Sequence, residues 1–191
     1  MLRQLLSGIA IVLTFVGYVP YLRSIHAGRT KPHMFTWIIW GATTLIVFFA
    51  QLAGGGGAGA WPTGVSGCIT IYVAVLSYLK RGDSSIRPID WLFLVASLGS
   101  LPLWYFTDDP LWAVIVLTAA DTIGFGPTFR KAYHRPFEEE LSIYSILVVR
   151  NSIAAIALER YTVTTLLFPL TVALTCAAFV AMVLSRRQTA T

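Results

Sequence analysis

The sequence predicts an all-α membrane protein with seven transmembrane helices. Hydrophobic residues make up 56% of the 191-residue chain, charged residues only 12%, and the mean hydropathy is +0.71. Soluble domains are usually about 45–50% apolar and about 25% charged, so this composition argues against a water-soluble globule. It also argues against a disordered chain, which needs low hydrophobicity and high charge.

Seven stretches are apolar enough to cross a bilayer, which takes about 20 mostly apolar residues per helix. Because they take up most of the chain, the loops between them are expected to be short. No small-residue cleavage motif followed by a soluble domain comes after the first stretch, so we interpret it as a helix of the mature protein. The stretches cover residues 5–22, 33–53, 61–79, 89–107, 110–129, 140–158 and 162–184.

Residues typical of helix boundaries stand where these spans begin. Asp109 and Pro110 supply an N-cap and a proline at the first helical position of the fifth span. The glutamates at 138–140 precede the sixth span, where the helix dipole favours acidic groups. The glycines at 54–57 predict a flexible turn between the second and third spans.

The basic residues predict the orientation of the helices. Of the 14 Lys and Arg residues, 11 fall in the loops after spans one, three, five and seven or just beyond them. Only Arg3 and Arg160 fall on the other side, and Arg150 lies within the sixth span. By the positive-inside rule, the N-terminus is outside and the C-terminus is cytoplasmic. Topology in a lipid bilayer thus accounts for the net charge of +5, and no nucleic-acid partner is predicted.

An internal repeat divides the chain. Residues 17–23 read Gly-Tyr-Val-Pro-Tyr-Leu-Arg, and residues 124–130 read Gly-Phe-Gly-Pro-Thr-Phe-Arg, at an offset of 107. The same offset carries Trp61-Pro62 onto Phe168-Pro169. We therefore predict two three-helix repeats, at 1–81 and 108–191, joined by a linker helix in 82–107. Because three is an odd number, the linker span gives the two repeats the same orientation, as in transporters with parallel repeats.

This 3+1+3 layout resembles the PQ-loop and SWEET superfamily. That group includes sugar transporters, Pnu-type vitamin transporters, lysosomal amino-acid exporters and the KDEL receptor. The Pro-Gln pair of its motif stands here as Pro20-Tyr21 in one repeat and Pro127-Thr128 in the other. The resemblance implies that Pro20 and Pro127 are hinge positions, because proline bends a helix; a static helix end is the alternative. It also allows a homo-oligomer.

Two ionisable residues lie inside the predicted spans, where a charge is costly and is a functional candidate. At about 1.5 Å per residue, Asp121 is roughly 16 Å and Arg150 roughly 14 Å from the outer ends of their spans. Both therefore fall near mid-depth, on helices adjacent in sequence. Either they form a structural ion pair, or they face a central pocket. In the pocket, Arg150 would hold an anionic or carbonyl group, or Asp121 would carry a proton.

Polar and aromatic residues at similar depth extend the candidate site. The only asparagine has an amide that suits sugar hydroxyls or another amide. An aromatic stripe with spacings of three and four runs along the second span, and the repeat offset carries it onto the sixth. Helix packing or an interfacial aromatic belt is the alternative for these rings. The predicted substrate-binding residues are Asp121, Arg150, Asn151, Thr44, Trp40, Trp37, Tyr72 and Tyr144.

The sequence carries no recognisable catalytic set. The HExxH, GxSxG and P-loop motifs are absent, and the three histidines lie in predicted loops without metal-ligand spacing. We therefore predict no catalytic residue, no metal and no cofactor, and the protein is not expected to be an enzyme. Cys68 and Cys176 are interpreted as packing residues within the spans.

These observations predict a transporter for a small polar solute, such as a sugar, a vitamin or an amino-acid-like compound. Movement would follow from alternating access between the two repeats, with coupling to protons left open. The alternative is a non-transporting receptor or sorting protein of the same fold. Arginine outnumbers lysine 11 to 3, and the chain has no Asn-x-Ser/Thr site. Both features favour a bacterial inner membrane.

Overall fold

The computed structural model describes residues 1–28, 34–80, 88–125, 129, 132–134, 136–138 and 141–189. These residues form helices and turns, with no strand among them, so the predicted all-α class is confirmed. The two short 3₁₀ helices are η1 (Gly57–Ala60) and η2 (Pro136–Glu138). The long helices are α1 (Leu2–His26), α2 (Met34–Ala53), α3 (Trp61–Leu79), α4 (Pro88–Thr107), α5 (Pro110–Gly124), α7 (Leu141–Ala157) and α8 (Val163–Thr189).

Three helical segments in the described part of the chain are long and apolar enough to cross a membrane. They are Leu2–His26, Gly57–Leu79 and Val163–Thr189. The other long helices are apolar over shorter stretches. For example, α5 ends at Gly124, short of the predicted 110–129, and its 15 residues rise only about 22 Å against a hydrocarbon core of about 30 Å. The length and composition of these three helices therefore indicate membrane association, whereas seven full spans remain a prediction.

The outer surface of the helices is rich in apolar side chains. Leu5 and Val12 of α1 are 63% and 60% exposed, and Val95 of α4 is 64% exposed. Scattered exposed apolar residues are common in soluble proteins, but whole helix faces of this kind are not. Contact with lipid accounts for such faces, because hydrocarbon does not penalise them.

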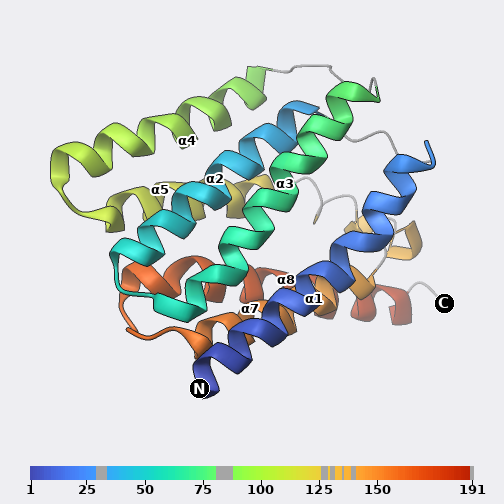
Figure 1. The fold of residues 1–191 in the computed structure, drawn as a ribbon. Helices are drawn as coiled ribbons and strands as arrows, with labels where there is room; N and C mark the ends of the chain where they lie inside the picture. Colours follow the sequence, from blue (N-terminus) through green and yellow to red (C-terminus); the bar gives the residue numbers. More distant parts are fainter. Residues whose placement is uncertain are drawn as a thin grey trace.

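The helices pack in a regular set of neighbours (Figure 1). Helix α2 packs along α3, and α7 packs along α8. Helix α1 contacts both α3 and α7, whereas α5 contacts both α8 and α2. Helix α4 lies at the edge, against α5 and α2. The helices before and after α4 in the chain therefore meet each other directly.

The turn between α2 and η1 packs against the turn between α7 and α8 (Figure 1). The Glu159 backbone N–H donates to the Gly56 carbonyl at 3.0 Å, and Gln51 Nε2 donates to the Thr165 carbonyl at 2.9 Å. Arg3 Nη1 of α1 donates to the Glu159 carbonyl at 2.9 Å. These bonds join residues more than a hundred positions apart and close this end of the helix bundle.

Glycine permits the close approach at this end. A Cβ added to Gly59 would lie 2.5 Å from Leu158 Cα, closer than real Cβ atoms come. Gly55 and Gly57 adopt φ angles of +80° and +55°, which side-chain-bearing residues rarely adopt. The expected turn at 54–57 is formed, and it packs closely as well, since a Cβ at Gly56 would lie 2.8 Å from the Gln51 carbonyl oxygen.

The predicted hinge prolines have different outcomes. Pro20 lies inside α1, and the helix continues past it to His26. A static helix end at Pro20 is therefore excluded, while a role as hinge remains a prediction. Pro127 lies outside the described residues.

Replacing Gly59 with alanine is expected to destabilise the protein, because the new methyl group collides with the Leu158 backbone. Overpacking of this kind typically costs about 1–3 kcal/mol. Gly8→Ala is the matched control, since a Cβ at Gly8 has nothing within 4 Å. Thermal unfolding in detergent measures both variants. Equal melting temperatures for Gly59→Ala and the wild type would contradict the close contact.

Candidate functional site

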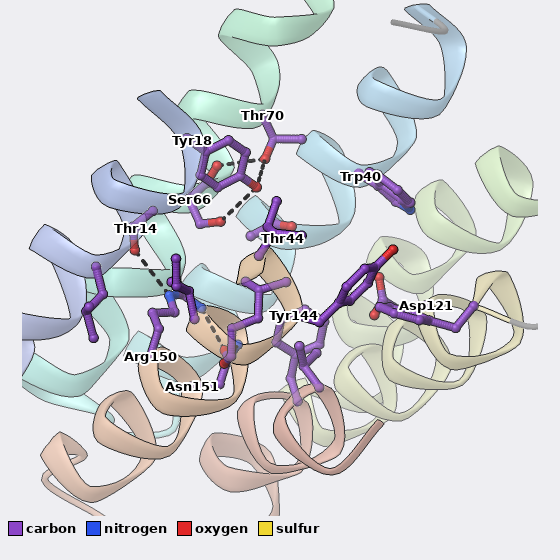
Figure 2. Close-up of a pocket in the computed structure, with 18 of the residues that line it drawn as sticks. Thr14, Tyr18, Trp40, Thr44, Ser66, Thr70, Asp121, Tyr144, Arg150 and Asn151 are labelled. Atoms are coloured by element: carbon purple, nitrogen blue, oxygen red, sulfur yellow. Dashed lines mark hydrogen bonds between the residues drawn. The ribbon is translucent and has the colours of Figure 1, made fainter. Parts of the chain in front are cut away.

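A cavity of about 260 Å³ lies among α1, α2, α3, α5, α7 and α8 (Figure 2). Ligand pockets in proteins usually measure about 300–1,000 Å³, so this one suits a small solute. Its walls combine apolar and aromatic side chains with polar groups from every one of these helices except α8. The polar residues of its lining are Thr14, Tyr18, Thr44, Ser66, Thr70, Asp121, Tyr144, Arg150 and Asn151.

Arg150 of α7 is the most buried charge of the pocket, with only 4% of its surface exposed. Its Nε donates to Thr14 Oγ1 at 3.2 Å, and its Nη1 donates to Asn151 Oδ1 at 2.7 Å. Its Nη2 donates to the Pro62 carbonyl. All three acceptors are uncharged. No acidic group of the described residues therefore balances the charge of this guanidinium.

The acceptors of Arg150 are themselves fixed by hydrogen bonds. Thr14 Oγ1 donates to the Ala10 carbonyl at 2.9 Å, which turns its lone pairs toward Arg150. Asn151 Nδ2 donates to the Leu147 carbonyl at 2.8 Å, which presents Oδ1 to the guanidinium. Asn151 is only 1% exposed. Its amide positions Arg150 and also lines the pocket, and the expected contact with a solute stays a prediction.

Asp121 of α5 lies on another wall of the same pocket and is partly exposed. Its carboxylate makes no hydrogen bond or ion pair with any residue in the described parts of the chain. Figure 2 shows Asp121, Tyr144 and Trp40 toward one end of the pocket, and Arg150 and Asn151 toward the other.

The structural ion pair considered for Asp121 and Arg150 is therefore not formed. The physical reason is the packing order of the helices. Helix α8 contacts both α5 and α7, whereas α5 turns its other sides to α4 and α2, and α7 packs against α1. The two charges are thus not paired, although their helices are adjacent in the sequence and their predicted depths are similar. Both face the pocket instead.

The aromatic candidates separate into two groups. Trp40 and Tyr144 line the pocket, as does Thr44 one turn after Trp40. Trp37 does not line it: its ring stacks on Tyr21 with centroids 5.2 Å apart and meets Trp40 edge-on at 5.5 Å. Trp37 thus packs against α1, in line with the packing alternative, and a contact with the solute stays a prediction.

Tyr72 also lies outside the pocket lining. It is 45% exposed, and its hydroxyl lies 3.4 Å from His26 Nε2. The predicted mid-depth position of Tyr72 gave no information on which face of α3 carries it, and its depth in a membrane stays a prediction. The contact with His26 shows that this face is turned toward the end of α1.

Sequence analysis missed a polar cluster contributed by α1 and α3. The Tyr18 hydroxyl lies 3.3 Å from Thr70 Oγ1 and 3.4 Å from Ser66 Oγ (Figure 2). Thr14 and Tyr18 are four residues apart on α1, and Ser66 and Thr70 are four apart on α3. Polar residues one turn apart within an apolar helix share a face. This spacing in the sequence could have indicated the cluster.

The described residues contain no group of three or more His, Cys, Asp or Glu side chains that could hold a metal ion. What the pocket offers is recognition: a guanidinium, a carboxylate, several hydroxyls and aromatic faces around a small cavity. Convergent polar groups in an otherwise apolar cavity are typical of sites for small molecules.

Comparisons with known proteins do not extend this picture. No family model, no curated protein and no solved structure matches the chain. The resemblance to PQ-loop and SWEET proteins therefore stays an expectation from the sequence.

Proposed function

We propose that the protein is a membrane transporter for a small polar solute. The solute binds in the pocket between two three-helix units and crosses the membrane as these units rock against each other. The units comprise residues 1–81 and 108–191, and the helix in 82–107 links them. The observation that carries the proposal is the pocket itself, which takes lining residues from all six helices of the two units and contains a charge of each sign.

The pattern of helix contacts supports two equivalent units. Under the repeat, α1, α2 and α3 correspond to α5, α7 and α8. The contact of α2 with α3 then corresponds to that of α7 with α8, and α1 with α3 corresponds to α5 with α8. Between the units, α1 with α7 corresponds to α5 with α2. A two-fold rotation about an axis along the membrane normal, which exchanges two similar units, would produce these matching helix contacts.

The end of the bundle where the α2–η1 turn packs against the α7–α8 turn, here called the turn end, is closed. This closed end supports a transport cycle. In the orientation expected from the basic residues, this end faces outside. It is held between the units by hydrogen bonds from Arg3, Gln51 and Glu159, with a further bond from the Ala58 N–H to Glu159 Oε1 at 3.3 Å. At about 0.5–1.5 kcal/mol net for each bond, their loss costs a few kcal/mol. Conformations separated by that much interconvert and can be shifted by a ligand.

The proposal includes seven spans, an outside N-terminus and a bacterial inner membrane as the location. The shorter apolar helices complete the bundle, since α2 packs between α3 and α5, and α4 covers the edge of α5 and α2. Residues Trp37–Ala53 and Leu141–Ala157 supply two of these shorter apolar helices.

Opening of the turn end should be visible as two distances between the units. Spin labels are placed at exposed positions, Leu2→Cys in the first unit and Val163→Cys in the second, with Cys68 and Cys176 replaced. Pulsed electron paramagnetic resonance in lipid is expected to give a bimodal distance distribution, because the turn end opens and closes.

The matched control for this experiment is a pair within the first unit, Leu2→Cys with Trp61→Cys, which is expected to give a single distance. A single narrow distance for the pair between the units, in lipid and with every solute added, would contradict alternating access and favour a non-transporting receptor.

Filling the pocket should stop transport. A Cβ at Gly17 meets only Ile146 Cγ2 at 3.7 Å, so a leucine there extends into the cavity with little strain at its base. Uptake by proteoliposomes of radiolabelled glucose, thiamine or alanine, whichever the wild type accumulates, is expected to fall at least tenfold in Gly17→Leu. Gly8→Leu, on the same helix with open space around it, should transport normally. Wild-type rates in Gly17→Leu would separate transport from this pocket.

A further inference from the structure

The pocket contains two charges that the described residues leave without a charged partner. Arg150 donates only to a hydroxyl, an amide oxygen and a backbone carbonyl. Asp121 has no hydrogen bond or ion pair among those residues, although the uncharged thiol of Cys176 lies within electrostatic reach of it. An unpaired charge in an apolar, largely buried setting is costly, and proteins normally pair such charges. A solute with complementary charges would supply both missing partners.

The Arg150 end has the chemistry of a carboxylate site. A guanidinium carries five N–H donors, of which three are used by Thr14, Asn151 and Pro62. Its planar fork matches the two oxygens of a carboxylate, and such bonds are shorter and stronger than those to neutral acceptors. The hydrogen bonds to Thr14 and Asn151 hold the fork in place before a ligand arrives.

The Asp121 end has the chemistry of an ammonium site. A carboxylate accepts hydrogen bonds from an ammonium group, and the pocket brings Trp40 and Tyr144 to the same end (Figure 2). The faces of aromatic rings attract cations, tryptophan most strongly, and more so where water is excluded. Acid and aromatic rings together favour a cation at this end of the pocket.

We infer that the solute is a small zwitterion, with its carboxylate at Arg150 and its ammonium group beside Asp121, Trp40 and Tyr144. This inference rests on the proposed function of the pocket as the solute site. The separation of the two ends in Figure 2 favours charges at the two ends of an elongated molecule. The cavity of about 260 Å³ limits that molecule to a small one. Neutral sugars would leave both charges unpaired.

Matched sets of ligands test the inference on the unaltered protein. The zwitterions are leucine, with its charges one carbon apart, and 4-aminobutyrate, with three carbons between its charged groups. In 2-hydroxy-4-methylpentanoate and 4-hydroxybutyrate, a hydroxyl replaces the ammonium group. In leucinamide and 4-aminobutanamide, an amide replaces the carboxylate. Calorimetric titration of the purified full-length protein is expected to show at least one zwitterion binding tenfold or more tighter than both of its analogues.

Two substitutions test which end of the pocket binds which charged group of the zwitterion. Asp121→Asn is expected to fold normally, because the carboxylate makes no bond within the described residues. It should remove the preference for the zwitterion over its hydroxy acid and leave the preference over its amide. Arg150→Gln should remove the preference for the zwitterion over its amide and leave the preference over its hydroxy acid. Thermal unfolding checks that this variant folds. Asp108→Asn and Lys80→Gln change exposed charges outside the pocket and should alter neither preference.

The inference is overturned if the hydroxy acids or the amides bind as tightly as the zwitterions, or if no zwitterion binds. It is also overturned if Asp121→Asn keeps the full preference for the zwitterion over its hydroxy acid. The two-distance measurement on the turn end can give its result without any ligand of this set. Two distances without zwitterion binding would therefore reject only the solute class, whereas one distance with zwitterion binding would reject transport.

Discussion

The buried guanidinium of Arg150 is the interaction on which the centre of the structure depends. Its three nitrogens reach Thr14 on α1, Pro62 at the start of α3 and Asn151 on its own helix, α7. One side chain thereby joins the beginning of the chain to its last third. Removing any acceptor would leave a buried charge less well solvated, which is more costly than losing an ordinary hydrogen bond. The same group that forms the pocket wall therefore also holds the two halves of the bundle together.

In the proposed transport cycle, this double role of Arg150 would connect binding of the solute with movement of the two units. A carboxylate at Arg150 would bind the two N–H donors of the same guanidinium that Thr14, Asn151 and Pro62 leave free. Because the ligand and the contacts between the halves would share one guanidinium, a bound anion that moves Arg150 would also alter its hydrogen bonds to Thr14 and Pro62. A ligand shifts a conformational equilibrium only through different affinity for its states, and contacts shared between ligand and interface provide such a difference.

The sequence predicted the helical class and the approximate position of each helix, because apolar stretches and their boundary residues are local features. It also singled out Asp121, Arg150, Asn151 and Tyr144, since polar groups are rare in apolar helices. It did not predict that the two charges would stand apart, because depth along a helix carries no information on rotation about its axis or on which helix is the neighbour. The same limit applies to Trp37 and Tyr72, which the sequence placed among the site residues but which do not line the cavity.

The proposed repeat offers a reason why Asp121 has no hydrogen bond or ion pair among the described residues. Asp121 corresponds to Thr14, and Arg150 corresponds to Thr43. The contact of Thr14 with Arg150 between α1 and α7 thus has an equivalent, Asp121 with Thr43, between α5 and α2. Thr43 Oγ1 instead lies 2.9 Å from Ser97 Oγ of α4, the helix outside the repeat. The linker helix engages the hydroxyl that symmetry would offer to Asp121. Two similar units can therefore enclose a pocket with a cationic end and an acidic end, because the single unpaired helix breaks their equivalence at this contact.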